Sequence, residues 1–526
     1  MNTISFSTQT EASEVLPQPE LATFNSLPDL IRQWGAVRGK HPAIVCDGVV
    51  VSFSALDAMI DRCTASLQRD GVVPGDAIAI CATNSINYAV VFFGALRAGA
   101  VVAPLSPAAH PDSLAGMISN SGAFTVFVDE SVAQLLSLVK LPDRIRIIRI
   151  DTQDFEDFLT PTGTLPTHVE IQRDWAFNII YSSGTTGVPK GIVQSHGMRH
   201  AFTVRSAERG YGPSAKVLIS TPLYSHTTLV SFFPTLGLGG TVILMTKFDA
   251  SQYLELAQRY RATHTMMVPV QYQRLLEHPD FDRHDLSALR TRFCTSAPFS
   301  AAIKAEILRR WPGELTEFYG MTEGGATCEL RVDQHPEKLH TVGMPIPGDE
   351  LRVIDSDGRE LAQGEVGEFV GRSPAMMTGY YKEPDKSAEV EWHDREGRRF
   401  IRTGDVGRFD DDGFVVLMDR RKDLIISGGF NLYPSDLEHI LASHAGVSEV
   451  AVIGVPSARW GETPVAFVTL RAGERQSRNE LLAWANERLG KMQRLADVVI
   501  VDSLPRSPIG KVLKRELRDR YDGAVA

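Results

Sequence analysis

The sequence predicts an α/β protein whose larger part is a doubly wound sheet with helices on both faces. Short apolar runs of strand length alternate with longer apolar helical patterns, and the connections between them are short. At 526 residues the chain is too long for one ordinary domain, so we expect about two to four subdomains. Turns and short strands such as Leu351–Ile354 predict a small barrel, and the residues after 423 predict a small α+β domain.

The first part of the chain repeats a strand–helix–strand pattern. Ala77–Cys81 and Val101–Leu105 are predicted as buried strands on either side of an apolar helix over Ile86–Ala98. Further strands are predicted over Thr125–Val128 and Ile145–Ile150. Because parallel strands need helical crossovers between them, this pattern indicates a parallel sheet that is covered on both faces.

A stretch rich in glycine and hydroxyl groups follows the predicted buried strand Trp175–Ile180. Tyr181–Gly191 contains three glycines, two serines, two threonines and Lys190, which together offer backbone and side-chain donors to a polyphosphate. Only two residues separate Gly184 from Gly187, and glycine follows the lysine, so the spacing is not that of a Walker A loop. A flexible surface loop is the alternative interpretation.

A second segment, Tyr319–Glu323, also suits a nucleotide. Its aromatic ring can stack on a purine, its threonine hydroxyl can bond a phosphate oxygen, and its carboxylate can hold Mg²⁺. Asp405 follows a glycine at the end of a predicted strand, where a carboxylate can accept two ribose hydroxyl bonds. Each segment alone could be an ordinary loop, but their co-occurrence with Tyr181–Gly191 favours nucleotide binding.

The longest run without charge is Val217–Thr246. Prolines and glycines interrupt it, so it predicts buried strands and a buried helix rather than a membrane span. Its first strand, Val217–Thr221, leads into polar and aromatic residues up to Thr228, where a doubly wound sheet places a ligand crevice. Thr265–Val270 is predicted as another buried strand, and Asp249 as a helix N-cap.

Composition excludes several classes of protein. The net charge of -10 argues against nucleic acid as a main partner. Five widely spaced cysteines without a CxxC pair argue against a disulfide framework or a zinc site and indicate a reducing compartment. No basic residue precedes Arg32, so no signal peptide is predicted, and we expect a cytoplasmic protein. Peripheral membrane contact is left open, as is the choice between monomer and homodimer.

Five motifs together resemble those of the adenylate-forming superfamily, in its acyl- and aryl-CoA synthetase branch. They occur in family order at Tyr181–Gly191, Tyr319–Glu323, Thr403–Asp405, Asp419–Asp423 and Pro505–Lys511, and the resemblance covers residues 27–520. It implies a large N-terminal domain over residues 24–419, after a poorly ordered segment at 1–23. It also implies a hinge at 420–422 and a mobile C-terminal domain over 423–526.

The resemblance assigns roles residue by residue. Lys511, Thr322 and Glu323 would be catalytic, and Glu323 would hold Mg²⁺. The hinge would be Lys422, and the coenzyme A tunnel would be lined by Gly428, Gly429 and Phe430. The nucleotide would contact Ser182, Ser183, Gly184, Thr185, Thr186, Gly187, Lys190, Ser296, Ala297, Pro298, Tyr319, Gly320, Met321, Thr322, Asp405, Arg420 and Lys511. The acid pocket would be lined by His226, Thr227, Thr228, Met266, Val268, Pro269, Gly324 and Gly325.

Three positions depart from the family pattern. His226 comes one residue late, after Ser225, so a pocket role and that of a satisfied buried histidine both stay open. Thr295 and Ser296 replace two glycines near the adenine, which predicts a stiffer backbone there. Met492–Leu495 stands where the family usually has Tyr-Lys-x-Pro.

The activity implied by the resemblance is that of an ATP-dependent carboxylic acid–CoA ligase. An acyl-adenylate and pyrophosphate form first, and the acyl group then moves to coenzyme A. ATP and coenzyme A would be the co-substrates, and Mg²⁺ the cofactor. The alternatives are transfer to a separate carrier protein, a luciferase-like oxygenase, and a non-catalytic nucleotide-binding protein.

The expected acid is a fatty or aromatic monocarboxylate. The pocket residues are mostly small or apolar, and no arginine is evident for a second carboxylate. Gly324-Gly325 predicts an open tunnel for a long acid. Phe248–Ser251 resembles a string in amino-acid-activating domains, but it follows the apolar run instead of preceding the helix, which weighs against an amino acid substrate.

Overall fold

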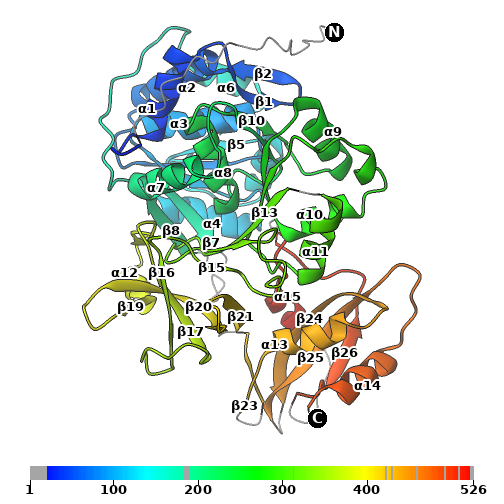
Figure 1. Ribbon diagram of the computed structural model, residues 1–526. Coiled ribbons are helices and arrows are strands. Elements are labelled where there is room, and N and C mark those ends of the chain that lie inside the picture. The colour runs from blue at the N-terminus through cyan, green and yellow to red at the C-terminus, as the bar shows by residue number, and fades with distance from the viewer. Residues whose placement is uncertain are drawn as a thin grey trace.

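The computed structural model describes residues 21–182, 190–311, 313–420, 423–427, 430–457, 460–490, 493–507 and 510–521, apart from the side chains of residues 419, 420, 430 and 431. Two large sheets with their helices form the upper body in Figure 1, a small β-sheet lies below it, and the C-terminal domain lies beside that sheet. This is the predicted α/β architecture with a half-barrel subdomain and a small C-terminal domain.

The first sheet has seven strands in the order β18-β8-β7-β4-β3-β5-β6. Strands β3 to β7 run parallel, whereas β8 and β18 are antiparallel additions at one edge. Its elements are β3 (Ala77–Cys81), α3 (Ile86–Arg97), β4 (Val101–Pro104), α4 (Pro111–Ser121), β5 (Thr125–Val128), α5 (Glu130–Leu136), β6 (Arg146–Arg149), α6 (Gln153–Phe158), β7 (Ala176–Ser182), β8 (Lys190–Ser195) and β18 (Gly379–Tyr380).

The second sheet has nine strands in the order β15-β14-β13-β12-β11-β9-β10-β1-β2, and its six central strands run parallel. Its strands are β1 (Pro42–Cys46), β2 (Val49–Ser52), β9 (Lys216–Ile219), β10 (Thr241–Leu244), β11 (His264–Met267), β12 (Thr291–Cys294), β13 (Glu314–Tyr319), β14 (Cys328–Arg331) and β15 (Met344–Pro345). Its helices are α1 (Leu27–Val37), α2 (Phe53–Arg69), α7 (His196–Ala207), α8 (His226–Gly237), α9 (Ala250–Tyr260), α10 (Pro269–Leu276) and α11 (Ala301–Arg310), with a 3₁₀ turn at Phe281–Arg283.

Two smaller sheets complete the described chain. The half-barrel consists of β16 (Glu350–Ile354), β17 (Gly367–Arg372), α12 (Pro384–Glu389), β19 (Glu391–His393), β20 (Arg399–Phe409) and β21 (Val415–Arg420). The C-terminal domain consists of β22 (Ile425–Ser427), β23 (Phe430–Leu432), α13 (Pro434–Ala442), β24 (Val447–Ser457), β25 (Gly461–Leu470), α14 (Arg478–Arg488), β26 (Asp497–Ile500) and α15 (Lys514–Asp519).

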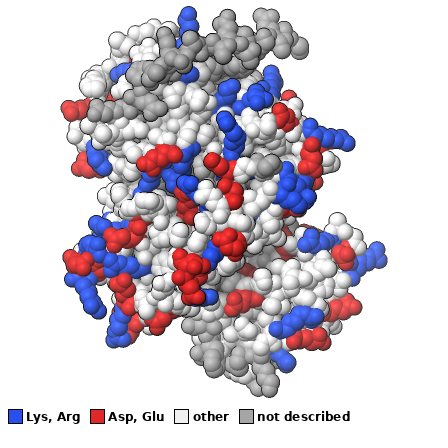
Figure 2. Space-filling model, in the orientation of Figure 1, with Lys and Arg blue, Asp and Glu red and all other residues white. Residues whose placement is uncertain are grey.

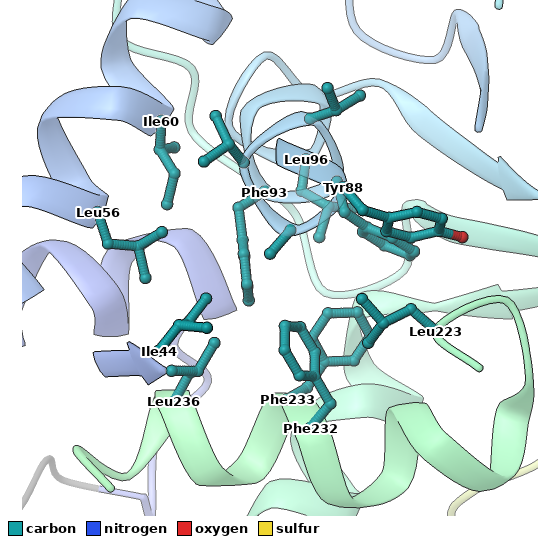
Figure 3. Packing of buried hydrophobic residues seen from close by; sticks show 14 of the residues in the cluster. Ile44, Leu56, Ile60, Tyr88, Phe93, Leu96, Leu223, Phe232, Phe233 and Leu236 are labelled. Atoms are coloured by element: carbon teal, nitrogen blue, oxygen red, sulfur yellow. The ribbon is translucent and has the colours of Figure 1, made fainter. Parts of the chain in front are cut away.

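Aromatic side chains hold the two large sheets together. Phe92 and Phe93 of α3 pack edge-on against Phe233 of α8, with ring centroids 5.1 and 5.5 Å apart. Figure 3 shows α3 and α8 facing one another across this cluster, where Phe232 and Leu236 also lie. Because a fully buried side chain of this size contributes about 1.5–3 kcal/mol, this layer fixes the orientation of α8, whose first residues reach the site.

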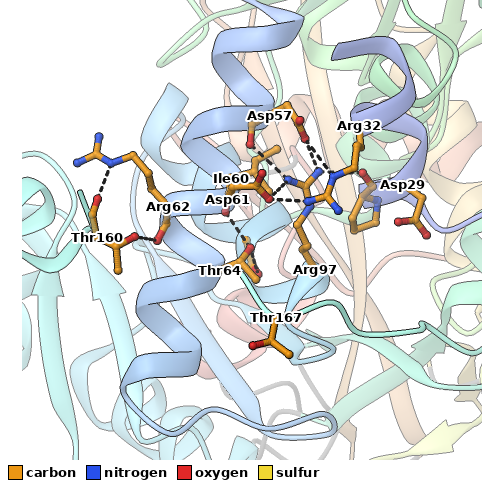
Figure 4. Close-up of polar contacts among 12 residues, drawn as sticks. Asp29, Arg32, Asp57, Ile60, Asp61, Arg62, Thr64, Arg97, Thr160 and Thr167 are labelled. Atoms are coloured by element: carbon orange, nitrogen blue, oxygen red, sulfur yellow. Dashed lines mark hydrogen bonds and ion pairs between the residues drawn. The ribbon is translucent and has the colours of Figure 1, made fainter. Parts of the chain in front are cut away.

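A charged network fastens the first three helices. Arg97 of α3 is 6% exposed, and its guanidinium binds Asp57 at 2.6 Å and Asp61 at 2.8 Å, both on α2. Arg32 of α1 binds Asp61 from the other side at 2.6 Å, so that one carboxylate joins three helices (Figure 4). Each buried charge has a partner of opposite sign, which offsets its desolvation.

Most sequence-based strands and helices are confirmed, including the N-cap at Asp249, whose carboxylate accepts from Gln252 N at 2.9 Å. One boundary was wrong. The strand predicted over Thr265–Val270 ends at Met267, because Pro269 is the first residue of α10, where a missing N–H costs nothing. The motif Asp419–Asp423 begins inside β21, which pairs with β20 as far as Arg420.

All five cysteines are free and buried, which confirms that no disulfide framework is present. None of the described helices is both long and apolar enough to cross a membrane. Acidic and basic side chains are interspersed over the face shown in Figure 2.

Two glycines near the half-barrel allow a test of the backbone packing. Both have left-handed φ values, +84° at Gly343 and +86° at Gly348. A Cβ at Gly343 would lie 1.9 Å from the carbonyl oxygen of Glu329, whereas one at Gly348 would meet nothing within 4 Å. We expect Gly348→Ala to cost about 1–2 kcal/mol of unfolding free energy and Gly343→Ala about 1–3 kcal/mol more, measured by urea denaturation. Equal losses would contradict the close backbone approach.

Candidate active site

The predicted motifs meet at the carboxyl edges of the two large sheets. The parallel strands β9, β11, β12 and β13 all end at one edge of the nine-stranded sheet, so the segments that follow them lie side by side. These are residues 220–228, 268–269, 295–298 and 320–325. Ligands of doubly wound sheets bind at such an edge.

Glu323 is held in place by Tyr380. The Tyr380 hydroxyl donates to Glu323 Oε1 at 3.0 Å, and the Lys190 ammonium lies 5.0 Å from the centre of the same ring. The pairing of β18 with β8 places Tyr380 opposite Ile192 and explains this contact. The second Glu323 carboxylate oxygen makes no hydrogen bond to a described residue, so it is available to a cation.

Tyr319 and Asp405 lie within hydrogen-bonding distance across the junction with the half-barrel. The Tyr319 hydroxyl donates to Asp405 Oδ2 at 2.8 Å. Burial, followed by the charge of Asp405, raises the pKa of Tyr319 well above its usual value, so the phenol remains a neutral donor. These positions are compatible with adenine stacking by Tyr319 and ribose binding by Asp405. Both roles stay predictions.

Ser296 carries a backbone strain that glycine would not. Its φ is +81°, in the left-handed region, where a side chain costs about 1–2 kcal/mol. The Ser296 hydroxyl forms a short hydrogen bond with the hydroxyl of Thr227 in the first turn of α8. The serine therefore keeps a glycine-like backbone and links the predicted nucleotide side to the predicted acid pocket.

Lys511 lies on a turn that touches the large domain. Ser507 N donates to Lys511 O at 2.8 Å, and the Arg506 side chain donates to Gly510 O at 2.6 Å. A Cβ on Gly510 would lie 2.8 Å from Cγ1 of Val270, the second residue of α10. The red end of the chain accordingly reaches up towards α10 and α11 in Figure 1. The predicted catalytic lysine is thus next to the predicted acid pocket, although its role stays a prediction.

The remaining pocket residues differ in their surroundings. Met266 and Val268 are buried and apolar. The Thr228 hydroxyl donates to Pro222 O at 2.6 Å and lies 2.7 Å from the Thr221 hydroxyl, so it is committed to the strand end.

One prediction about the pocket is wrong. A Cβ on Gly324 would lie 2.0 Å from Ala375 O, and one on Gly325 would lie 3.3 Å from Gly371 O. The half-barrel backbone fills the space beside these glycines, so they permit close packing rather than open a tunnel.

Several predicted residues lie outside the described part of the chain. They are Ser183, Gly184, Thr185, Thr186, Gly187, Lys422, Gly428 and Gly429, together with the side chains of Arg420 and Phe430. Ser182 and Lys190, which flank the segment predicted to bind phosphate, pair with each other across β7 and β8. Ala297, Pro298, Gly320 and Met321 lie on the loops that follow β12 and β13.

Sequence analysis missed three residues that contact the site. Tyr380 contacts Glu323, and Gln194 donates to Thr322 O at 2.7 Å and to His226 Nδ1 at 3.1 Å. Arg199 in turn donates to the Gln194 side chain. A buried arginine and glutamine five residues apart give no local sequence signal. Gln194, directly after Ile192 and Val193 in β8, was the only available sign.

Residues 31–381 match the AMP-binding enzyme family, and residues 436–511 match the C-terminal domain of AMP-binding enzymes. The chain belongs to the AMP-binding enzyme family. This assignment agrees with a site in which Tyr319, Glu323 and Asp405 gather at the carboxyl edge of the sheets.

Relatives of this AMP-binding enzyme use different acyl acceptors. A fatty acid–[acyl-carrier-protein] ligase, ScoC of Streptomyces coeruleorubidus, is 31% identical over 92% of this chain and 94% of its own. A feruloyl-CoA synthase of Amycolatopsis sp is 33% identical over 90% and 94%. The structure of ATP-bound MatB from Rhodopseudomonas palustris has a TM-score of 0.85 and 29% identity, covering 95% of this chain and all of the other. The enzyme is therefore an adenylate-forming enzyme that activates acyl groups with ATP.

The strain at Ser296 can be measured by comparing two substitutions. Ser296→Ala and Ser296→Gly both remove the hydroxyl that bonds Thr227, but only glycine relieves the left-handed backbone. We expect the alanine variant to be less stable than the glycine variant by about 1 kcal/mol in urea unfolding. Thr227→Val, which removes the same hydrogen bond without touching the backbone at 296, is the control. Equal stability of the two Ser296 variants would show that the position is not left-handed.

Proposed function

We propose that this enzyme is an ATP-dependent carboxylic acid–CoA ligase acting on a fatty or aromatic monocarboxylate. In the first half-reaction the acid attacks the α-phosphorus of ATP and releases pyrophosphate. In the second, the coenzyme A thiol attacks the acyl-adenylate and releases AMP. The observation that supports it most is the contact of the Lys511 turn with the first turn of α10, which sets a C-terminal lysine beside a pocket built on the other domain.

The electrostatic problem of the first step is that two anions must meet. Lys190 lies over the ring of Tyr380, whose hydroxyl bonds Glu323, and Lys511 follows Gly510 on the C-terminal turn that packs against α10. Two cations from different elements would offset the repulsion and stabilise the charge that develops on the phosphate oxygens. Such donors are worth a few kcal/mol each in a water-poor site.

Magnesium fits the donor set at Glu323. One carboxylate oxygen is oriented by Tyr380 and the other is available. Among the described residues no three His, Cys, Asp or Glu side chains gather as a metal cage. Mg²⁺ is usually held by one or two carboxylates together with substrate phosphates, so Glu323 suffices as the protein's contribution. When bound, the ion would neutralise phosphate charge.

We infer the class of acid from the pocket residues and the acyl acceptor from the relatives. Met266 and Val268 give the pocket buried apolar surface, which favours a fatty or aromatic acid over a polar one. Free coenzyme A is the proposed acceptor because the similar feruloyl-CoA synthase is named for a coenzyme A product. A carrier protein is the second candidate, favoured by the similarity to ScoC. We also propose that the enzyme works in the cytoplasm.

Pyrophosphate release separates these possibilities. We expect release with fatty or aryl acids to need ATP, and thioester formation to need coenzyme A as well. Lys511→Ala should lower the rate of adenylation by about a hundredfold or more, because it removes a positive charge from the transition state. Arg515→Ala is the control, since Arg515 makes only an exposed 3.9 Å pair with Asp519. Thioester formation with a carrier protein but not coenzyme A would favour the second candidate. No release with any acid would rule out the ligase.

The hydroxyl of Tyr380 gives a second test. Tyr380→Phe removes the hydrogen bond that orients Glu323, so we expect a higher Mg²⁺ concentration for half-maximal activity, by about three- to tenfold. The control is Tyr381→Phe, because the neighbouring hydroxyl donates to Ser121 O at 3.2 Å, away from Glu323. An unchanged Mg²⁺ dependence in Tyr380→Phe would argue against Glu323 as the magnesium ligand.

A further inference from the structure

We propose that Gln194 is a positioning residue for the acid. It holds neutral His226 in the tautomer whose Nε2–H donates to the carboxylate of the acid, and the same amide bonds the carbonyl oxygen of Thr322. The inference rests on the proposed function, since it concerns how the acid is bound. It follows from the hydrogen-bonding capacity of three side chains and one backbone carbonyl; among the side chains, Arg199 can only donate.

The orientation of the Gln194 amide is determined by its neighbours. Arg199 donates to Gln194 Oε1, and a guanidinium has no acceptor. On the other side Gln194 Nε2 lies 2.7 Å from the carbonyl oxygen of Thr322, which can only accept. In the flipped orientation Gln194 Oε1 would face the carbonyl oxygen of Thr322, which is also an acceptor. The NH₂ group would face the Arg199 guanidinium, which is also a donor. The oxygen must therefore face Arg199, and the NH₂ group must face Thr322.

Arg199 is itself fixed. It is 2% exposed, and its guanidinium donates to Asn178 Oδ1 at 3.0 and 3.2 Å and lies 5.5 and 5.6 Å from the ring centres of Phe177 and Phe233. No described carboxylate pairs with it, and burial lowers the pKa of Arg199 to about 9. A buried cation that has only amide oxygens as acceptors holds them firmly, because hydrogen bonds from charged donors are about twice as strong as neutral ones.

The tautomer of His226 follows from the amide. The second hydrogen of Gln194 Nε2 points to His226 Nδ1 at 3.1 Å, so Nδ1 must accept and the ring proton must sit on Nε2. Burial, followed by the charge of Arg199, puts the pKa of His226 well below its usual value. The ring is therefore neutral with one donor, Nε2–H. No described residue accepts from this donor.

The position of this donor suits the acid. His226 is half-buried and is the first residue of α8, and the next residue, Thr227, bonds Ser296 at the end of β12. Thr322 stands one residue before Glu323, at the predicted phosphate end of the site. A hydrogen bond from a neutral donor to one carboxylate oxygen would orient the other towards the phosphorus. An imidazolium would bind the ground-state carboxylate more tightly and lower its reactivity.

The experiment compares Gln194→Glu and Gln194→Leu with wild type. Glutamate accepts from Arg199 as glutamine does and gives the buried guanidinium a partner of opposite charge, but it cannot donate to His226 Nδ1. The tautomer should therefore change to Nδ1–H. Leucine removes both contacts. The readouts are the ¹⁵N chemical shifts of His226 in histidine-labelled protein, assigned with His226→Asn, and steady-state kinetics with octanoate and benzoate. Gln68→Leu is the control, because Gln68 makes paired amide bonds with Thr167 far from the site.

The expected result is an Nε2–H tautomer in wild type that changes to Nδ1–H in Gln194→Glu, and in both variants a KM for the acid raised about three- to tenfold with KM for ATP within twofold of wild type. An Nδ1–H or charged ring in wild type would overturn the proposal. So would variants that lower kcat and raise both KM values together, because that pattern indicates a structural role. If neither acid supports turnover but the tautomer is as expected, the proposed function has failed. The role of Gln194 then requires that the dissociation constant of octanoate or benzoate rises when Gln194 is changed.

Discussion

One short segment, residues 319–325, connects the half-barrel, β8 and β18, and the geometry of the site depends on its packing. Tyr319 bonds the half-barrel through Asp405, and the Thr322 carbonyl accepts from β8 through Gln194. Glu323 binds Tyr380 by its side chain and accepts from Met377 N at 2.7 Å by its carbonyl. The segment can do this because Gly324 and Gly325 let it run against the backbone of residues 371–376, where a Cβ would collide.

The sequence predicted those features that depend on local patterns. Apolar runs of strand length located the parallel strands of the seven-stranded sheet and β9 and β11 of the nine-stranded sheet, and the N-cap at Asp249 followed from its position before a helical pattern. The edge at which the motifs gather also followed, since parallel strands carry their carboxyl ends to one side. Boundaries shifted where backbone chemistry prevailed over hydrophobicity, as at Pro269, which begins a helix instead of ending a strand.

The rest depends on contacts between residues that are distant in sequence. Tyr380 reaches Glu323 only because β18 pairs with β8, and no pattern near residue 380 announces that pairing. The sequence indicated that Gly324 and Gly325 leave space for a substrate, whereas the half-barrel backbone occupies the space beside them. Ser296 looked like a stiffer replacement for glycine, yet its backbone stays left-handed, and the hydroxyl it adds finds Thr227. In each case the tertiary neighbour decides what the residue does.

Strand β8 relates the two ends of the proposed reaction. It begins at Lys190, directly after the segment predicted to bind phosphate, and it carries Gln194 four residues later. Side chains at positions i and i+4 of a strand lie on the same face and are separated by roughly 13 Å. The lysine faces Tyr380 and Glu323, whereas the glutamine faces Thr322 and His226. A single strand thus sets the spacing between the lysine predicted to bind phosphate and the amide proposed to orient the donor to the acid. A displacement of the phosphate end would move the donor with it.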